Sequence, residues 1–172
     1  MFRSKAYFAA VILILGLLCS PAGAFAQKLV FVVRHAERAD DGTTRMQGRP
    51  DPSLSAAGAA RAVRLAQMLA DSNVKGIYVT EYRRTQETAK PLAAKLGIDL
   101  RQVDSGDIDG LIRKLRDECP ADVVLVVGHS NTVPGILKAL GGDDVKIADD
   151  EYDNLFLIVP RTGTMTRIRF RP

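Results

Sequence analysis

Residues 29–35 read LVFVVRH, a continuous apolar and largely β-branched run that ends at Arg34 and His35. A run of this kind predicts a strand that is buried on both faces, as in a parallel sheet covered by helices. Residues 123–129, VVLVVGH, repeat the pattern and end at His129. These are the two histidines of the chain, and each of them directly follows a predicted buried strand.

The segments around these two runs alternate between helical and strand patterns. Ser53 or Ser55 is expected to cap the first helix, and Gly97 is expected to end the second. The resulting order, βαβαβαβαββ, predicts an α/β protein with a mostly parallel central sheet. The expected helices are Ser53–Leu69, Glu81–Leu96, Asp107–Glu118 and Thr132–Leu140, and the further expected strands are Val74–Thr80, Ile98–Val103, Leu155–Val159 and Thr164–Phe170.

The first 26 residues have the pattern of a secretory signal. Arg3 and Lys5 form a short basic region, and Ala6–Leu18 is an apolar run of 13 residues. A membrane-spanning helix needs about 20 residues, and the small residues of Ala24–Ala26 fit a cleavage site before Gln27. We therefore expect residues 1–26 to be a signal peptide and residues 27–172 to form a single domain. The product is expected to be periplasmic or secreted, without stable membrane insertion after cleavage; an uncleaved anchor is the alternative.

Composition and charge narrow the classes of function. The 172 residues are 47% hydrophobic and 26% charged, which fits one globular domain. Two of the 24 basic residues lie in the predicted signal, which leaves 22 against 20 acidic residues. A charge this weak argues against a nucleic-acid partner. Cys119 is the only cysteine after the predicted signal, and we interpret it as a semi-exposed structural thiol. Two histidines with scattered acids indicate neither a metal site nor a cofactor, and the sequence favours no oligomeric state.

The topology is expected to bring polar residues together at one edge of the sheet. The carboxyl ends of parallel strands meet at the same edge, where open α/β sheets bind ligands. His35 and His129 lie there, with Arg34 beside the first strand and Arg84 near the start of the following helix. The helix that opens at Asn131–Pro134 is expected to point its first N–H groups into the same cleft. Neutral imidazole is nucleophilic and guanidinium matches phosphate oxygens, so the set favours phosphoryl transfer through a phosphorylated histidine.

These residues also carry a family resemblance. Four segments match motifs of the histidine phosphatase (phosphoglycerate mutase-like) superfamily, in the family's order: Arg34–Glu37, Asp51–Gly58, Thr80–Ala89 and Val127–Asn131. The third segment aligns Arg84, rather than Arg83, with the family's catalytic arginine. The resemblance covers nearly all of Lys28–Arg169 and implies a three-layer sandwich around a mostly parallel sheet.

The resemblance also implies roles for individual residues. His35 would be the nucleophile that becomes phosphohistidine, while Arg34, Arg84 and His129 would stabilise the oxygens of the transferring group. Glu37 is expected either to hold His35 or Arg84 in place at the substrate site or to be a solvated loop acid.

Further polar residues are candidates for substrate binding. Arg38 and Asn131 follow the two histidine motifs and are assigned to the substrate. Arg38, Arg45 and Arg49 would either reach a second anionic group or be simple surface charges, and surface charge is the preferred interpretation for the set.

The chain departs from the family pattern in two places. Members that release an alcohol usually carry an acid after the third strand, where this chain has Gln102; Asp104, Asp107 or no residue at all would take that role. The second histidine lacks the following aspartate of the acid-phosphatase and phytase branch. Asp149–Asn154, with Tyr152, would cover the site or cap the sheet, and capping is the preferred interpretation.

The sequence as a whole predicts an exported, metal-independent histidine phosphatase. It would hydrolyse a small phosphorylated substrate, a phosphomonoester, through a phosphohistidine intermediate. The alternatives are a non-catalytic phospholigand-binding protein, and a mutase or phosphohistidine-protein phosphatase of the same superfamily.

Overall fold

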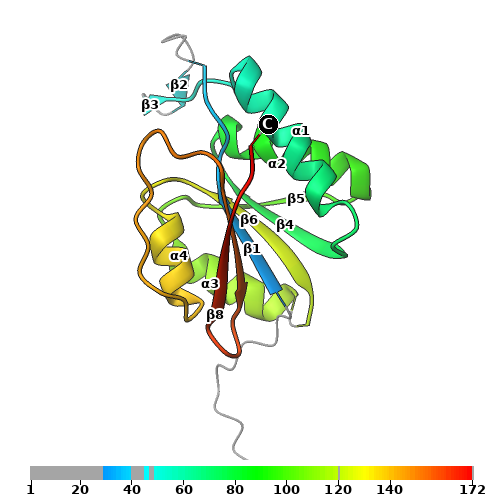
Figure 1. Cartoon of the computed structure of the whole chain (residues 1–172), viewed down its shortest axis with the longest axis vertical. Coiled ribbons are helices and arrows are strands. Elements are labelled where there is room, and N and C mark those ends of the chain that lie inside the picture. Colours follow the sequence, from blue (N-terminus) through cyan, green and yellow to red (C-terminus); the bar gives the residue numbers. More distant parts are fainter. Residues whose placement is uncertain (1–28, 40–44, 47–48, 120, 172) are drawn as a thin grey trace, which may run out of the picture.

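The computed structural model describes residues 29–39, 45–46, 49–119 and 121–171. The predicted signal peptide, residues 1–26, lies outside the described residues. Figure 1 shows a central twisted sheet with helices on both of its faces. Within the described part of the chain, no helix is long and apolar enough to cross a membrane.

The central sheet has six strands in the order β5-β4-β6-β1-β7-β8. Strands β1, β4, β5 and β6 pair in parallel, whereas β7 is antiparallel to β1 and β8 is antiparallel to β7. This arrangement confirms the predicted α/β class and the mostly parallel sheet. The strands are β1 Leu29–Arg34, β4 Val74–Thr80, β5 Leu100–Val103, β6 Val123–Gly128, β7 Asn154–Val159 and β8 Thr164–Arg169.

A small antiparallel pair, β2 Arg45–Met46 and β3 Arg49–Pro50, lies outside the central sheet and was not predicted. Two-residue strands carry no periodicity, so a sequence pattern cannot indicate them.

The three layers follow from the alternation of side chains along the buried strands. Val30 and Val32 of β1 face one core, and Phe31 and Val33 face the other. The first core is covered by α3 Ile108–Glu118 and α4 Val133–Ala139, and the second by α1 Ala56–Leu69 and α2 Arg83–Leu96 (Figure 1). Each fully buried Val, Leu or Phe contributes about 1.5–3 kcal/mol relative to an exposed one, so this double burial fixes the register of β1.

The ends of α1 and α2 agree with the predicted capping residues Ser55 and Gly97, and Asp107 caps α3, which was not predicted. The Ser55 hydroxyl accepts from Gly58 N at 3.1 Å, and the Asp107 carboxylate accepts from Gly110 N at 2.7 Å. Gly97 ends α2 with a φ of 67°, a left-handed conformation that glycine adopts without strain. Helix α2 begins at Arg83, two residues later than predicted, because Glu81 and Tyr82 form the turn after β4.

The interpretation of Cys119 as semi-exposed is wrong. Cys119 is fully buried, and its Sγ lies 2.7 Å from Arg101 Nη1 and 3.5 Å from the Tyr78 hydroxyl. The charged helix that precedes it suggested exposure, but the chain turns inward where α3 ends.

Candidate active site

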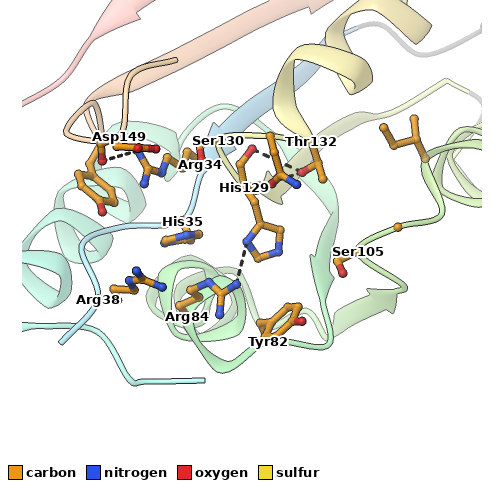
Figure 2. Close-up of a pocket in the computed structure, with 14 residues that line it drawn as sticks. Arg34, His35, Arg38, Tyr82, Arg84, Ser105, His129, Ser130, Thr132 and Asp149 are labelled. Atoms are coloured by element: carbon orange, nitrogen blue, oxygen red, sulfur yellow. Dashed lines mark hydrogen bonds between the residues drawn. The ribbon is translucent and has the colours of Figure 1, made fainter. Parts of the chain in front are cut away.

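A pocket of about 590 Å³ opens at the carboxyl ends of β1, β4 and β6. Figure 2 shows His35 and His129 side by side in it, with Arg34 above and Arg84 below. The structure therefore brings together the four residues predicted as catalytic. The expectation that both histidines lie at one edge of the sheet is met because β1 and β6 are paired neighbours, with Arg34 opposite Gly128.

His35 is held as a neutral imidazole with a defined tautomer. It is 5% exposed, and its Nδ1 lies 2.8 Å from the main-chain oxygen of Ala36. A carbonyl oxygen only accepts, so Nδ1 carries the proton and Nε2 keeps its lone pair. Burial lowers the pKa of His35 to about 3. The hydrogen bond to Ala36 O acts against this shift, and the positive charges of Arg84 and Arg34 act with it. Near neutral pH, Nε2 therefore carries a free lone pair.

Arg34 connects the pocket to the segment before β7. Its Nη1 donates to the main-chain oxygens of Ala148, Asp149 and Glu151 at 3.0, 2.9 and 3.2 Å. The guanidinium carbon lies 3.9 Å from the centre of the Tyr152 ring, in a cation–π arrangement. Arg34 Nε is buried without a hydrogen-bond partner in the described part of the chain, and burial lowers the pKa of Arg34. The Nη1 side of this guanidinium is thus used by the protein itself.

Tyr152 lines the pocket, and its ring centre lies 6.1 Å from that of His35. The segment Asp149–Asn154 therefore forms a wall of the site. It also caps the sheet, as the preferred interpretation had it, because Glu151 pairs with Arg167 and Arg169 of β8 and Asp153 O accepts from Phe170 N at 2.8 Å. The contacts from Arg34 draw it over the end of β1.

Arg84 occupies the opposite side of the pocket. Its Nη1 forms an ion pair with Asp51 at 3.6 Å, and its Nη2 lies 3.3 Å from His129 Nδ1. Tyr82 stacks beneath the guanidinium, 4.1 Å from the ring centre to the guanidinium carbon. Arg83, by contrast, is exposed and pairs with Glu87 one helical turn away. The geometry supports the choice of Arg84 over Arg83 as the arginine of the site.

Asp51 is a site residue that sequence reasoning missed. It is 3% exposed and also accepts from Arg83 N at 3.0 Å, so it orients the start of α2 as well as the Arg84 side chain. Asp51 lies in one of the four motif segments, which marked it as a candidate, but nothing in the sequence indicated that its carboxylate faces Arg84.

His129 lies against both His35 and the end of β4. The two imidazole ring centres are 5.3 Å apart with the rings at 65°. The Nε2 of His129 lies 3.0 Å from the Thr80 hydroxyl, which sequence reasoning also missed. Burial lowers the pKa of His129 to about 4, and the positive charge of Arg84 acts in the same direction. Both histidines of the site are therefore neutral at pH 7.

Glu37 does not hold His35 or Arg84. Its carboxylate forms a bidentate ion pair with Arg61 of α1, with distances of 2.6 and 2.8 Å, and Arg61 also donates to Phe170 O at 2.9 Å. The assignment of Glu37 to the substrate is corrected on this ground: a buried arginine on the inner face of α1 requires an acid, and Glu37 supplies it. Gly58 allows this close approach, because a Cβ there would lie 2.0 Å from Glu37 O.

Two of the N–H groups expected to face a ligand at the start of the helix after His129 are used inside the protein. The amides of Thr132 and Val133 both donate to His129 O, at 3.1 and 2.9 Å. The turn that follows His129 thus closes on itself. Asn131, which was assigned to the substrate, is exposed and lines the pocket.

Arg38 is exposed, lines the pocket and lies close enough to Arg34 and Arg84 to lower the pKa of each. Burial is the larger cause of both shifts. The other two loop arginines, Arg45 and Arg49, are positions of the short strands β2 and β3.

The two candidate acids point to other partners. The Asp104 carboxylate accepts from Gly106 N at 2.8 Å, and Asp107 caps α3. Neither lines the pocket. Ser105 and Gly106 line it instead, and Glu81 holds Ser105 through the Ser105 amide and hydroxyl at 2.8 and 2.6 Å. In residues 29–39, 45–46, 49–119 and 121–171, no group of three or more His, Cys, Asp or Glu could hold a metal ion.

Fold and site together define an α/β protein with a pocket built around two neutral histidines and converging guanidinium groups. Residues 30–107 match the model of the histidine phosphatase superfamily (branch 1), so this part of the chain has the sequence pattern of that superfamily. The resemblance predicted from the four motifs is thereby confirmed.

Known proteins show the same relationship. The chain is 28% identical over 145 residues to phosphoglycerate mutase-like protein 4 of Arabidopsis thaliana, covering 78% of this chain and 60% of that protein. The matched part of this chain spans between 33% and 60% of the length of the curated relatives that it resembles.

Two solved structures share the fold. The protein histidine phosphatase SixA complexed with tungstate has a TM-score of 0.60 at 18% identity, covering 81% of this chain and 94% of that one. The mycobacterial glucosyl-3-phosphoglycerate phosphatase in complex with VO3 has a TM-score of 0.62 at 15% identity, covering 84% and 99%. They confirm the three-layer, phosphoglycerate mutase-like architecture.

Proposed function

We propose that this chain is an exported phosphatase that hydrolyses a small phosphomonoester through a phosphohistidine at His35. The observation that carries the proposal is the hydrogen bond from Nδ1 to Ala36 O, which leaves the Nε2 lone pair of a neutral imidazole in a pocket with Arg34, Arg38 and Arg84. Export rests on the signal pattern of residues 1–26.

The reaction takes place in two displacements at phosphorus. In the first, the Nε2 lone pair of His35 forms a bond to phosphorus while the bond to the leaving oxygen breaks, and that oxygen takes the electron pair. In the second, water attacks the phosphohistidine, the P–N bond breaks, its electrons return to Nε2, and the proton of the water passes to solvent. Arg34 and Arg84 stabilise the negative oxygens in both steps, which is the main protein contribution in phosphoryl transfer.

The position of the acids supports a restriction on the leaving group. An alkoxide needs a proton as it departs, and a positioned acid contributes about 10²–10⁴-fold, whereas an aryloxide such as nitrophenolate departs without one. Asp104 and Asp107 accept main-chain N–H groups outside the pocket. Among the described residues that line the pocket, the carboxylic acid is Asp149. If Asp149 does not donate this proton, the proposed enzyme favours aryl phosphates over alkyl phosphates.

The test is the His35→Ala variant with an aryl phosphate, in a buffer that contains excess chelator. We expect wild-type turnover in chelator, an acid-labile and alkali-stable phosphoryl adduct on the wild-type protein, and loss of both adduct and turnover in His35→Ala. Turnover above about 1% of wild type in His35→Ala would contradict the nucleophile assignment. Tight binding of the aryl phosphate without turnover would identify the chain as a non-catalytic phospholigand-binding protein.

A further inference from the structure

A chain of buried hydroxyl groups lies behind His129. The Nε2 of His129 is 3.0 Å from Thr80 Oγ1, which is 3.1 Å from Thr85 Oγ1, which in turn is 2.8 Å from Tyr82 O. Thr80, Thr85 and His129 are 5%, 0% and 6% exposed, so solvent does not exchange freely with these groups. The catalytic roles proposed above do not use either threonine.

The direction of each hydrogen bond follows from the end of the chain. Tyr82 O is a carbonyl oxygen and only accepts, so the Thr85 hydroxyl donates its single proton to it. Thr85 Oγ1 then only accepts, from the Thr80 hydroxyl and from Thr80 N at 3.1 Å. The Thr80 hydroxyl therefore donates its proton to Thr85 Oγ1, and Thr80 Oγ1 accepts a hydrogen bond from His129 Nε2. The hydroxyl chain requires a proton on Nε2.

The other ring nitrogen leads to the same assignment independently. His129 Nδ1 lies 3.3 Å from Nη2 of Arg84, and a guanidinium only donates. Nδ1 must therefore carry the lone pair. In the alternative tautomer, an N–H on Nδ1 would face the N–H of Arg84, and two donors would oppose each other at this distance.

We infer that Thr80, oriented by Thr85, is a positioning residue that holds neutral His129 in its Nε2–H tautomer, so that Nδ1 accepts from Arg84 and keeps this guanidinium in the pocket. The catalytic consequence rests on the proposed phosphatase function, but the tautomer does not. The two histidines of the site then have opposite tautomers: His35 carries its proton on Nδ1, because Nδ1 donates to Ala36 O.

The tautomers can be measured without any substrate. The chain has two histidines, so ¹⁵N-histidine-labelled protein without a histidine tag gives two imidazole spin systems in a long-range ¹H–¹⁵N spectrum. The signals that remain in His35→Ala belong to His129. At pH 7 we expect Nε2–H for His129 and Nδ1–H for His35. A proton on Nδ1 of wild-type His129, or a protonated ring, overturns the inference.

Variants of Thr80 test its part. Thr80→Val removes the hydroxyl at nearly constant shape, and we expect His129 to become a mixture of tautomers and kcat/KM for an aryl phosphate to fall about tenfold or more. Thr80→Ser keeps the hydroxyl and is expected to restore both. Thr88→Val is the matched control, because Thr88 is also buried but bonds Ala36 N and Arg84 O rather than the His129 ring.

The outcomes separate the inference from the proposed function. An unchanged His129 tautomer in Thr80→Val, or the same change in Thr88→Val, overturns the positioning role. Should Thr80→Val fail to fold, the wild-type spectrum and Thr80→Ser decide the question. Absence of turnover with the expected tautomers would contradict the phosphatase proposal and leave the positioning inference standing.

Discussion

The pocket has two halves made of the same three residue types. One contains His35, Arg34 and Tyr152, and the other contains His129, Arg84 and Tyr82; in each, the arginine stacks on the tyrosine ring, at 3.9 and 4.1 Å. Their supports differ. In the first half, His35 and Arg34 donate to main-chain carbonyls. In the second half, His129 and Arg84 contact each other and side chains from elsewhere in the fold.

This difference determines what a substitution can disturb. A main-chain acceptor is present whatever residue occupies the position, so the first half depends on where the segment from Ala148 to Tyr152 lies. The second half depends on the identity of Thr80 and Asp51. We therefore expect variants near Arg84 to change turnover with little effect on stability, and variants of Arg34 to change both.

The largest effect is expected from Arg84→Lys. An ammonium keeps the charge but loses the planar guanidinium that contacts His129 and Asp51 at once and that, in the proposed reaction, binds a phosphoryl oxygen. We expect kcat/KM to fall about 10³-fold, or ~4 kcal/mol of transition-state stabilisation, with the free energy of unfolding nearly unchanged. Arg83→Ala is the control and should stay within about twofold, because Arg83 is exposed. The reverse ranking would assign the site to the neighbouring arginine.

The second effect is a loss of stability in mild acid, to which both halves contribute. The pKa of His35 lies at about 3 and that of His129 at about 4 in the fold, against an ordinary value of 6.5. Between pH 6.5 and about 4 the unfolded chain binds more protons than the folded chain, so the free energy of unfolding falls as the pH falls.

Each histidine is expected to contribute about 2 kcal/mol of this loss between pH 7 and pH 5. Urea unfolding at both pH values measures it, with His35→Gln and His129→Gln as comparisons that remove one titrating group each. If all three proteins lost the same stability on acidification, neither histidine would be buried and neutral as described.

Arg34→Lys is expected to have a smaller effect on turnover than Arg84→Lys, about tenfold in kcat/KM. The reason is that Nη1 of Arg34 already donates to main-chain oxygens of the protein. It should instead loosen the segment it holds. We expect faster amide hydrogen exchange in residues 148–152 of this variant and unchanged exchange there in Arg84→Lys. Equal exchange in both variants would remove the distinction between the two halves.

The sequence predicted the backbone of this site better than its side-chain contacts. Burial of a strand on both faces appears directly as an apolar run, so the ends of β1 and β6, and with them His35 and His129, were correctly placed. The contacts of Asp51, Thr80 and Tyr152 depend on which side chains meet across loops, and periodicity carries no information about that.

One missed contact did have a usable signal. Arg61 falls among the apolar positions of α1, and a charged residue on a buried helix face requires an opposite charge. That rule would have directed the search for a partner to the acids in nearby loops, including Glu37, before any geometry was known. The role expected for Glu37 at the substrate was wrong because it was assigned from the position of Glu37 in the Arg34–Glu37 motif, without asking which acid pairs with Arg61.

The smallest effect on turnover is expected from Glu37→Gln, which lies outside both halves. An amide keeps part of the hydrogen bonding to Arg61 but loses the charge, and Arg61 is 8% exposed, so the free energy of unfolding should fall by about 1–2 kcal/mol. Asp144→Asn is the control: its ion pair with Lys138 is exposed, and the loss should stay within about 0.5 kcal/mol.

Turnover decides whether Glu37 is only structural. Burial raises the pKa of Glu37, but the hydrogen bonds from Arg61 outweigh it and lower the pKa overall, so the carboxylate is already ionised and paired at neutral pH. Its contribution to stability is present above its ordinary pKa and is lost as the pH falls through the lowered value, and Glu37→Gln should remove that dependence. We expect kcat/KM for an aryl phosphate to stay within about twofold of wild type. A fall of more than about tenfold at unchanged stability would return Glu37 to the substrate site and show that the pocket extends past Arg38.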